Sequence, residues 1–320
     1  MGTAVVAEAG PDQGVAWHYG NPSREQRELE AGRGVVDLSH RGVLTVSGPD
    51  RLSWLHSLTT QQLTELAPGV GTTAMILSGS QGHIEHVLYG VDDGETFWAH
   101  TEPGGVGALV GFLDRMRFML RVEVADRSAD FGVVWTTADL GVDHLSRSYS
   151  DSLGGHDLFV PRDKINDLVA TGSPAGTWAY EARRIAAGVP RVGVDTDERA
   201  IPNEIGVLGT AVHLNKGCYP GQETVGRVQA LGRPPRRLVR LHLDGSAEAL
   251  PEVGAPIMLG GKQVGRMGSS ARHWEEGPIG LGLVKRNVPI DAEFTVDGIA
   301  AAQEVLVDPE IGDHFRPQFA

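Results

Sequence analysis

A chain of 320 residues is long enough to bury a large core and to divide into about two or three domains. Hydrophobic residues make up 41% and charged residues 22%, as in ordinary globular proteins, and 43 glycines indicate many turns and short strands rather than a helical bundle. The formal net charge of -13 argues against direct nucleic-acid binding and against an anionic membrane surface, so an anion site has to be a local basic patch.

The single cysteine, Cys218, excludes an internal disulfide framework and a cysteine-cluster zinc or iron–sulfur site within one chain. The N-terminal stretch MGTAVVAEAGPDQG lacks the basic flank and apolar run of a secretory signal, and Val6 stands where a myristoylation motif needs Ser or Thr. The apolar runs are too short to span a bilayer. We therefore expect a cytoplasmic protein with no membrane partner, and a monomer.

The first half of the chain alternates helical and strand patterns after a flexible lead-in over residues 1–20. A charged helix-prone segment ends at Gly32, and Leu52, Leu55 and Leu58 recur at helical spacing behind a strand. The pattern predicts, in chain order, a helix over 23–31, a strand near 43–46, a helix near 52–58, three strands over 72–100 and a helix running into a strand over 107–124.

The second half begins with another strand–helix set over 131–170 and a helix from Trp178 that stops before Gly188. This mixture of hairpins and helices predicts an α+β fold rather than a doubly wound parallel sheet. Pro234-Pro235 indicates a domain boundary, and the strands and turns that follow it predict a small β-barrel.

The segment NKGCYPGQETVGR, residues 215–227, places the cysteine between glycines and polar residues. One interpretation is a structural turn with a small thiol packed beneath it. A second is a reactive thiol, because Lys216 favours the thiolate and the glycines leave it accessible. A third is a ligand loop, in which backbone N–H groups approach a bound molecule while Gln222 and Glu223 fix its polar edge.

The same region carries the most basic stretch of an acidic protein. Arginine at this density suits the recognition of carboxylate or phosphate groups, and the alternative is a solvated linker face. The stretch consists of Lys216, Arg227, Arg233, Arg236, Arg237 and Arg240.

The octapeptide KGCYPGQE, Lys216–Glu223, resembles the signature K-G-C-aromatic-x-G-Q-E of the YgfZ family, within the GcvT-like folate-binding superfamily. The resemblance extends to HYGNPSREQRELEAGRGVVDLSHRGVLTVSG near the start, to RIAAGVPRVGVDTDERAIPNE before the motif, and to GKQVGRMGSS and GPIGLGLVKR near the end. It therefore covers nearly the whole chain.

The resemblance implies a three-domain clover leaf in which two ferredoxin-like domains and a C-terminal β-barrel surround a central folate channel. We expect two interleaved α+β domains over 21–233 and the barrel over 234–320. The implied cofactor is tetrahydrofolate, with or without a polyglutamate tail. Arg41, Tyr180 and Tyr219 are candidates to stack on or clamp its rings, and Arg227 and the arginines after it are candidates to face its glutamate carboxylates.

The resemblance also implies a role in assembly or repair of iron–sulfur enzymes, and through them in tRNA modification, with iron–sulfur client proteins as partners. Cys218, assisted by Lys216, is the implied functional thiol. The first alternative is a folate-dependent aminomethyltransferase, which is weakened because Glu85 stands in place of an Asp and Ala186 replaces a pterin-binding Glu. The second is a thiol redox protein without folate. We expect a maintenance factor rather than a conventional enzyme.

Overall fold

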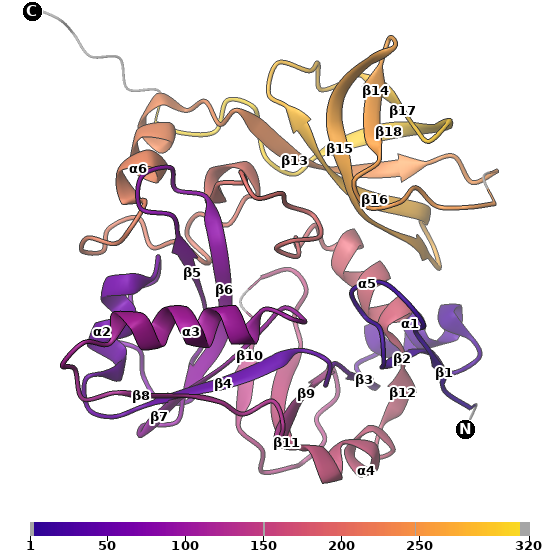
Figure 1. Cartoon of the computed structure of the whole chain (residues 1–320). Helices are drawn as coiled ribbons and strands as arrows, with labels where there is room; N and C mark the ends of the chain where they lie inside the picture. Colours follow the sequence, from indigo (N-terminus) through magenta and orange to yellow (C-terminus); the bar gives the residue numbers. More distant parts are fainter. Residues whose placement is uncertain (1–2, 150, 247, 314–320) are drawn as a thin grey trace, which may run out of the picture.

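The computed structural model describes residues 3–149, 151–246 and 248–313. These residues form a short N-terminal hairpin, two five-stranded sheets and a closed six-stranded barrel (Figure 1). Helices and strands alternate along the chain and most neighbouring strands are antiparallel, so the α+β class predicted from the sequence is confirmed. In this part of the chain no helix combines the length and apolarity needed to cross a membrane.

One sheet has the order β5-β6-β7-β4-β8 and is antiparallel throughout. An inner strand of this sheet, GVLTVS, is rich in β-branched residues and buried on both faces, because Leu44 and Val46 pack with two helices on one face and Val43 packs with residues of the other sheet. The elements are β4 (Gly42–Ser47), α2 (Arg51–Leu58), β5 (Gly71–Leu77), β6 (Ile84–Asp92), β7 (Thr96–Thr101), α3 (Val106–Met116) and β8 (Glu123–Asp126).

The other sheet has the order β10-β11-β9-β3-β12. Its strand β3 comes before the first sheet in the chain and its remaining strands come after that sheet, so the two units are interleaved. The elements are α1 (Pro22–Glu30), β3 (Gly34–Asp37), β9 (Phe131–Thr136), β10 (Ser146–Ser148), β11 (His156–Pro161), the 3-10 turn η1 (Arg162–Lys164), α4 (Ile165–Val169), β12 (Ser173–Ala175) and α5 (Thr177–Ala186).

The C-terminal strands close into the expected barrel, in the order β13-β16-β15-β14-β17-β18. Val239, Leu241 and Met267 are fully buried within its core. The strands are β13 (Arg236–Leu243), β14 (Pro256–Leu259), β15 (Lys262–His273), β16 (Gly277–Lys285), β17 (Glu293–Val296) and β18 (Ile299–Val305). Residues 314–320 of the expected barrel domain lie outside the described residues.

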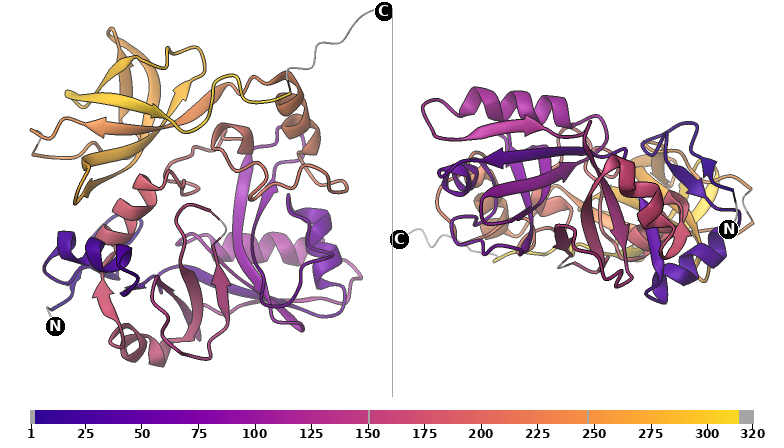
Figure 2. Two further views of the ribbon diagram at one scale, coloured as in Figure 1. Left: turned by 180° about the vertical axis from the view of Figure 1, so that it is seen from behind. Right: turned by 90° about the horizontal axis from the view of Figure 1, so that it is seen from below.

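A largely irregular segment joins α5 to the barrel, and it contains the 3-10 turn η2 (Pro202–Glu204) and the helix α6 (Gln222–Leu231). The barrel and α6 lie side by side above the two sheets in Figure 1, with α5 below the barrel and α6 above the β5–β6 hairpin, and the view from behind in Figure 2 agrees. One apolar core joins the β5–β6 hairpin, α5, α6 and the barrel, to which they contribute side chains such as Val87, Ala182, Val225 and Leu281.

The lead-in differs from the flexible segment expected from the sequence. Strand β1 (Val5–Val6) pairs with β2 (Ala16–His18), and the hairpin lies against the start of α5. A Cβ at Gly176 would lie 2.1 Å from the carbonyl oxygen of Trp17, so the hairpin approaches α5 as closely as glycine alone permits. Tertiary packing therefore orders a segment whose local pattern is weak. Residues 1–2 lie outside the described residues.

Candidate functional site

The KGCYPGQE segment crosses the β5–β6 hairpin and enters α6 at Gln222. Its cysteine, Cys218, is exposed. Gly221 has a φ of 82°, and a Cβ there would lie 2.9 Å from the Cβ of Leu77 and 3.0 Å from the Cα of Gly82. Residues other than glycine do not tolerate both this backbone conformation and this contact. Gly221 therefore lets the loop pack closely on the hairpin, and the thiol stays on the surface.

Lys216 anchors the loop to the end of a helix in another part of the fold. Its ammonium group is buried, donates to the carbonyl oxygens of His56 and of Thr59 (2.6 Å to the latter), and lies 4.9 Å from the ring of Tyr219. Burial lowers the pKa of Lys216 to about 8, against the opposing attraction of Cys218. Lys216 therefore holds the cysteine loop onto the C-terminus of α2 rather than reaching into solvent.

The remaining residues of the motif make fewer contacts with the rest of the protein. The side-chain amide of Gln222 lies 3.5 Å from the carbonyl oxygen of Lys216, so it braces the loop. Glu223 and Arg227 are exposed on the first turns of α6. The structure thus brings Lys216, Tyr219 and Gln222 together around the base of the loop, and it leaves Cys218, Glu223 and Arg227 on its outer side.

The predicted basic patch is largely neutralised, which corrects the expectation that these arginines face a ligand tail. Arg236 makes paired contacts with Asp197 and with Glu204, at 2.6–3.0 Å. Arg237 is buried at the barrel, where it donates to Gln303, and Arg240 donates to Glu304 and to a backbone carbonyl. Of the arginines named in this stretch, Arg227 and Arg233 remain exposed without a partner among the described residues.

Arg41 and Tyr180 come together although 139 residues separate them. The Nη2 atom of Arg41 donates to the hydroxyl of Tyr180 at 3.3 Å, and the guanidinium lies 5.5 Å from the Tyr180 ring and 5.9 Å from the ring of Tyr89. Both Arg41 and Tyr180 are buried, whereas Tyr89 is partly exposed. The positive charge of Arg41 therefore lies between the aromatic rings of Tyr180 and Tyr89, at the point where both sheets and α5 meet.

Several buried polar atoms in and around this cluster have no hydrogen-bond partner among the described residues, and they include Nε of Arg41 and Oε1 of Glu102. The second carboxylate oxygen of Glu102 accepts from Arg191 at 3.0 Å. Burial alone would raise the pKa of Glu102, but the charges of Arg191 and Arg41 outweigh it and lower the pKa, so the carboxylate is ionised. An unpartnered donor and an unpartnered acceptor thus lie among flat aromatic rings, a combination that buried polar groups rarely show without a ligand or water.

A second set of buried polar residues packs against the same cluster. Nε2 of His100 lies 2.8 Å from Asp157, and Arg147 donates to the same carboxylate at 3.1 Å. Burial would raise the pKa of Asp157, but His100 and Arg147 hold it at about 2. Arg147 also lies 4.2 Å from the ring of Tyr149. These hydrogen-bonded charges form a rigid surface against which Tyr89 and Tyr149 pack.

The sequence did not reveal Tyr89, Glu102, Arg147, Tyr149 and Asp157 as site residues. They come from β6, β7, β10 and β11 and their edges, and no short motif contains them. The available signal was alternation: Tyr89 pairs with His100 across β6 and β7, which places both rings on the same face of the sheet.

The two positions that separate this chain from the aminomethyltransferase pattern are also visible. Glu85 is exposed on β6, where a bulge interrupts the pairing with β5, whereas Ile84 and Val87 on either side of it pack into the shared core. Ala186 ends α5 and packs against that same core with Tyr89. Tyr89 therefore connects the Arg41–Tyr180 pair with the core that also contains Tyr219 of the cysteine loop.

Comparison with known proteins matches both the barrel and the whole chain. A family model described as the CAF17 C-terminal beta-barrel domain matches residues 236–309. A putative chloroplastic transferase of Arabidopsis thaliana is 26% identical over 314 residues, which cover 86% of this chain and 70% of that protein. An aminomethyltransferase of Streptomyces avermitilis is 27% identical over 312 residues, which cover 85% and 82%.

Among solved structures, the glycine cleavage system aminomethyltransferase T of Bartonella henselae superposes with a TM-score of 0.79 at 17% identity, covering 98% of this chain and 96% of that one. The expected three-part fold with its closed barrel is therefore confirmed. The chain has the aminomethyltransferase fold with a CAF17-type barrel, and it is similar in sequence to aminomethyltransferases over most of its length.

Proposed function

We propose that this protein binds tetrahydrofolate between its two sheets and α5, and that Cys218 serves at the protein surface in the assembly or repair of iron–sulfur enzymes. The observation that most strongly supports a chemical role for Cys218 is the structure of the cysteine loop. Lys216 ties it to α2 and Gly221 seats it on the β5–β6 hairpin, yet Cys218 itself stays exposed. A structural thiol would be packed beneath such a loop, so its exposure favours a chemical role.

The residues of the Arg41 cluster suit a reduced folate. A pterin needs flat faces for stacking and an edge that offers both donors and acceptors. Tyr89 and Tyr180 supply the faces, and the unpartnered atoms of Arg41 and Glu102 supply one donor and one acceptor. When bound, tetrahydrofolate would supply a carrier for one-carbon units, while these residues would hold and orient its ring system.

The substitution at Ala186 supports a binding protein over a transferase of the usual kind. An alanine at this position removes the carboxylate that the resemblance assigns to pterin recognition, and Glu102 is the carboxylate that remains in the cluster. Glu85 is exposed, so it does not supply a buried acid at the position where the aminomethyltransferase pattern has an Asp. The second candidate is nevertheless a folate-dependent aminomethyltransferase, because relatives of that name match more than four-fifths of the chain.

Calorimetric titration with tetrahydrofolate tests the folate half of the proposal. Wild-type protein and Cys218→Ala are expected to bind with the same affinity, whereas Tyr89→Leu is expected to bind about tenfold more weakly because it loses one stacking face. Tyr19→Leu, at a partly exposed tyrosine outside the cluster, is the control. Failure of the wild-type protein to bind would refute the folate site.

A complementation experiment tests the thiol half. A strain lacking the protein is supplied with wild type, Cys218→Ala or Ser57→Ala, and the activity of its iron–sulfur enzymes is measured. We expect wild type and Ser57→Ala to restore activity and Cys218→Ala to fail while folding normally. Full restoration by Cys218→Ala would remove the thiol from the proposal. Release of formaldehyde equivalents from an aminomethyl donor by the purified protein would favour the transferase instead.

A further inference from the structure

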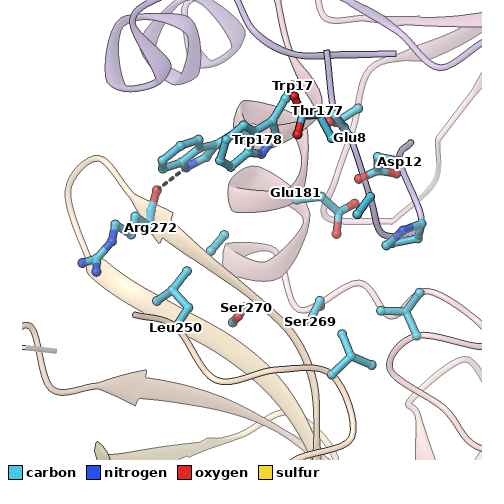
Figure 3. A pocket seen from close by; sticks show the side chains of 16 residues that line it. Glu8, Asp12, Trp17, Thr177, Trp178, Glu181, Leu250, Ser269, Ser270 and Arg272 are labelled. Atoms are coloured by element: carbon cyan, nitrogen blue, oxygen red, sulfur yellow. Dashed lines mark hydrogen bonds between the residues drawn. The ribbon is translucent and has the colours of Figure 1, made fainter. Parts of the chain in front are cut away.

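A cavity of about 560 Å³ lies between the N-terminal hairpin, α5 and the barrel (Figure 3). It is separate from the Arg41 cluster, because its lining comes from residues 7–17, the first turns of α5, Val194, and residues 250–253 and 269–272 of the barrel. Its volume lies within the usual range of about 300–1,000 Å³ for small-molecule sites. Neither the cysteine loop nor the Arg41 cluster contributes residues to its lining.

Two stacked indoles form one end of the cavity. The rings of Trp17 and Trp178 lie 4.8 Å apart at an interplanar angle of 24°, and Figure 3 shows the two side by side. Trp178 is held by a hydrogen bond from its indole N–H to the carbonyl oxygen of Arg272, at 3.4 Å. Trp17 is 44% exposed although it is one of the largest apolar side chains, so this wall presents an aromatic face to whatever enters.

Carboxylates line the side of the cavity that faces the hairpin. Glu8, Asp12 and Glu181 contribute them, and Figure 3 shows Glu181 and Asp12 side by side. Glu8 is exposed and makes no hydrogen bond or ion pair within the described residues. The guanidinium of Arg272 points to the other side, where it donates to the carbonyl oxygen of Glu248 at 2.7 Å. The lining thus has an excess of negative charge.

The charges behind this wall do not cancel that excess. Arg191 contacts Asp12, Glu102 and Glu181, and Arg184 contacts Glu181 and Asp195. With Arg41, whose charge also acts on Glu102, these four carboxylates face three guanidinium groups, and Glu8 adds a fifth carboxylate to the lining. Burial would raise the pKa of Asp12, but His40 and Arg191 together hold it far below its usual value, so this carboxylate is ionised. An entering cation meets a negative potential that is already in place.

The lining is also fixed before any ligand arrives. Thr177 donates to the carbonyl oxygen of Ala16, Ser270 donates to that of Pro251, and Ser269 donates to Asp195 at 2.6 Å. Gly176 seats the hairpin on α5 without room for a side chain. Pre-organised walls reduce the entropic cost of binding, which distinguishes this cavity from a chance gap between two elements.

From the indole wall, the carboxylate side and the fixed lining together, we propose that the cavity is a binding site for a small organic cation, an aromatic or apolar group carrying a protonated amine. The flat group packs on the exposed side of the stacked Trp17–Trp178 pair, and the ammonium faces Glu8, Asp12 and Glu181. This site is additional to the proposed folate site and does not depend on it.

A matched pair of probes tests the charge and the shape separately. Phenethylamine and 3-phenylpropionate share a ring and a two-carbon arm, but one is a cation and the other an anion at neutral pH. Calorimetry is expected to give saturable binding of the amine and at least about tenfold weaker binding of the acid. Amine titration is expected to shift the indole N–H resonances of Trp17 and Trp178 and to leave the other tryptophans unchanged.

Two variants locate the site. Trp17→Leu is expected to weaken amine binding about tenfold, through the lost aromatic face. Glu8→Gln, at an exposed residue, is expected to weaken it about threefold without a change in stability, whereas Glu123→Gln on β8 leaves it unchanged. Absence of amine binding, equal binding of the two probes, or binding that neither variant at the cavity alters would each overturn the proposal. Saturating tetrahydrofolate is expected to leave amine binding unchanged, which separates this site from the folate cluster.

Discussion

Replacing Arg184 by methionine removes the charged group that links α5 to Asp195 in the connecting segment and to the hydroxyl of Ser269 in the barrel. Its side chain is almost fully buried, donates to Asp195 at 2.8 Å and to Ser269 at 2.7 Å, and also holds Glu181 and the carbonyl oxygen of Val189. Methionine fills much of the same volume but carries no charge, so the variant leaves Asp195 with an uncompensated negative charge in a site that water does not reach.

Removal of one partner from a buried ion pair costs about 3–5 kcal/mol. Asp195 still accepts from the backbone N–H groups of Arg191 and Ser269, at 2.8 and 2.7 Å, so the lower end of that range applies. We expect a loss of about 3 kcal/mol in the free energy of unfolding, which is a factor of roughly 150 in the unfolding equilibrium.

Urea unfolding followed by tryptophan fluorescence measures this loss, with Arg33→Met as the matched control. Arg33 also pairs with a glutamate, at 2.8 Å from Glu28, but its side chain is 60% exposed, and such a pair contributes less than about 1 kcal/mol. If the two variants lose the same stability, burial does not set the strength of these pairs and the reasoning is refuted.

Two further predictions follow from the fit of the hairpin and of the cysteine loop. Gly176→Ala is expected to cost about 1–3 kcal/mol in urea unfolding, since its Cβ would overlap the carbonyl oxygen of Trp17, and a cost near zero would contradict the close packing of the hairpin. Because the pKa of Lys216 is about 8 in the folded protein against 10.5 for the ordinary side chain, the unfolded chain binds more protons between these values and stability should rise with pH across that window. Lys216→Met is expected to flatten this rise relative to wild type, and parallel stability curves for the two proteins would show that Lys216 is not the group responsible.

Elements governed by local pattern were predictable. The helix predicted over 23–31 is observed at Pro22–Glu30, because a capping Asn21, a proline in the first turn and a charged face all favour it locally. The strand and helix predicted near 43–58 are observed as β4 and α2, and the barrel follows the proline pair as expected. In contrast, α6 escaped prediction, since its sequence QETVGRVQAL contains a glycine and shows a weak apolar face.

The sequence by itself determined the class of fold, the position of the barrel and the cysteine motif, because each rests on residues that are neighbours in the chain. Only the tertiary structure decided that Arg41 contacts Tyr180 and Tyr89, and that Arg236 forms ion pairs with Asp197 and Glu204. Side chains far apart in sequence acquire partners only when strands and helices pack, and burial then sets which charges are matched and which atoms are left for a ligand.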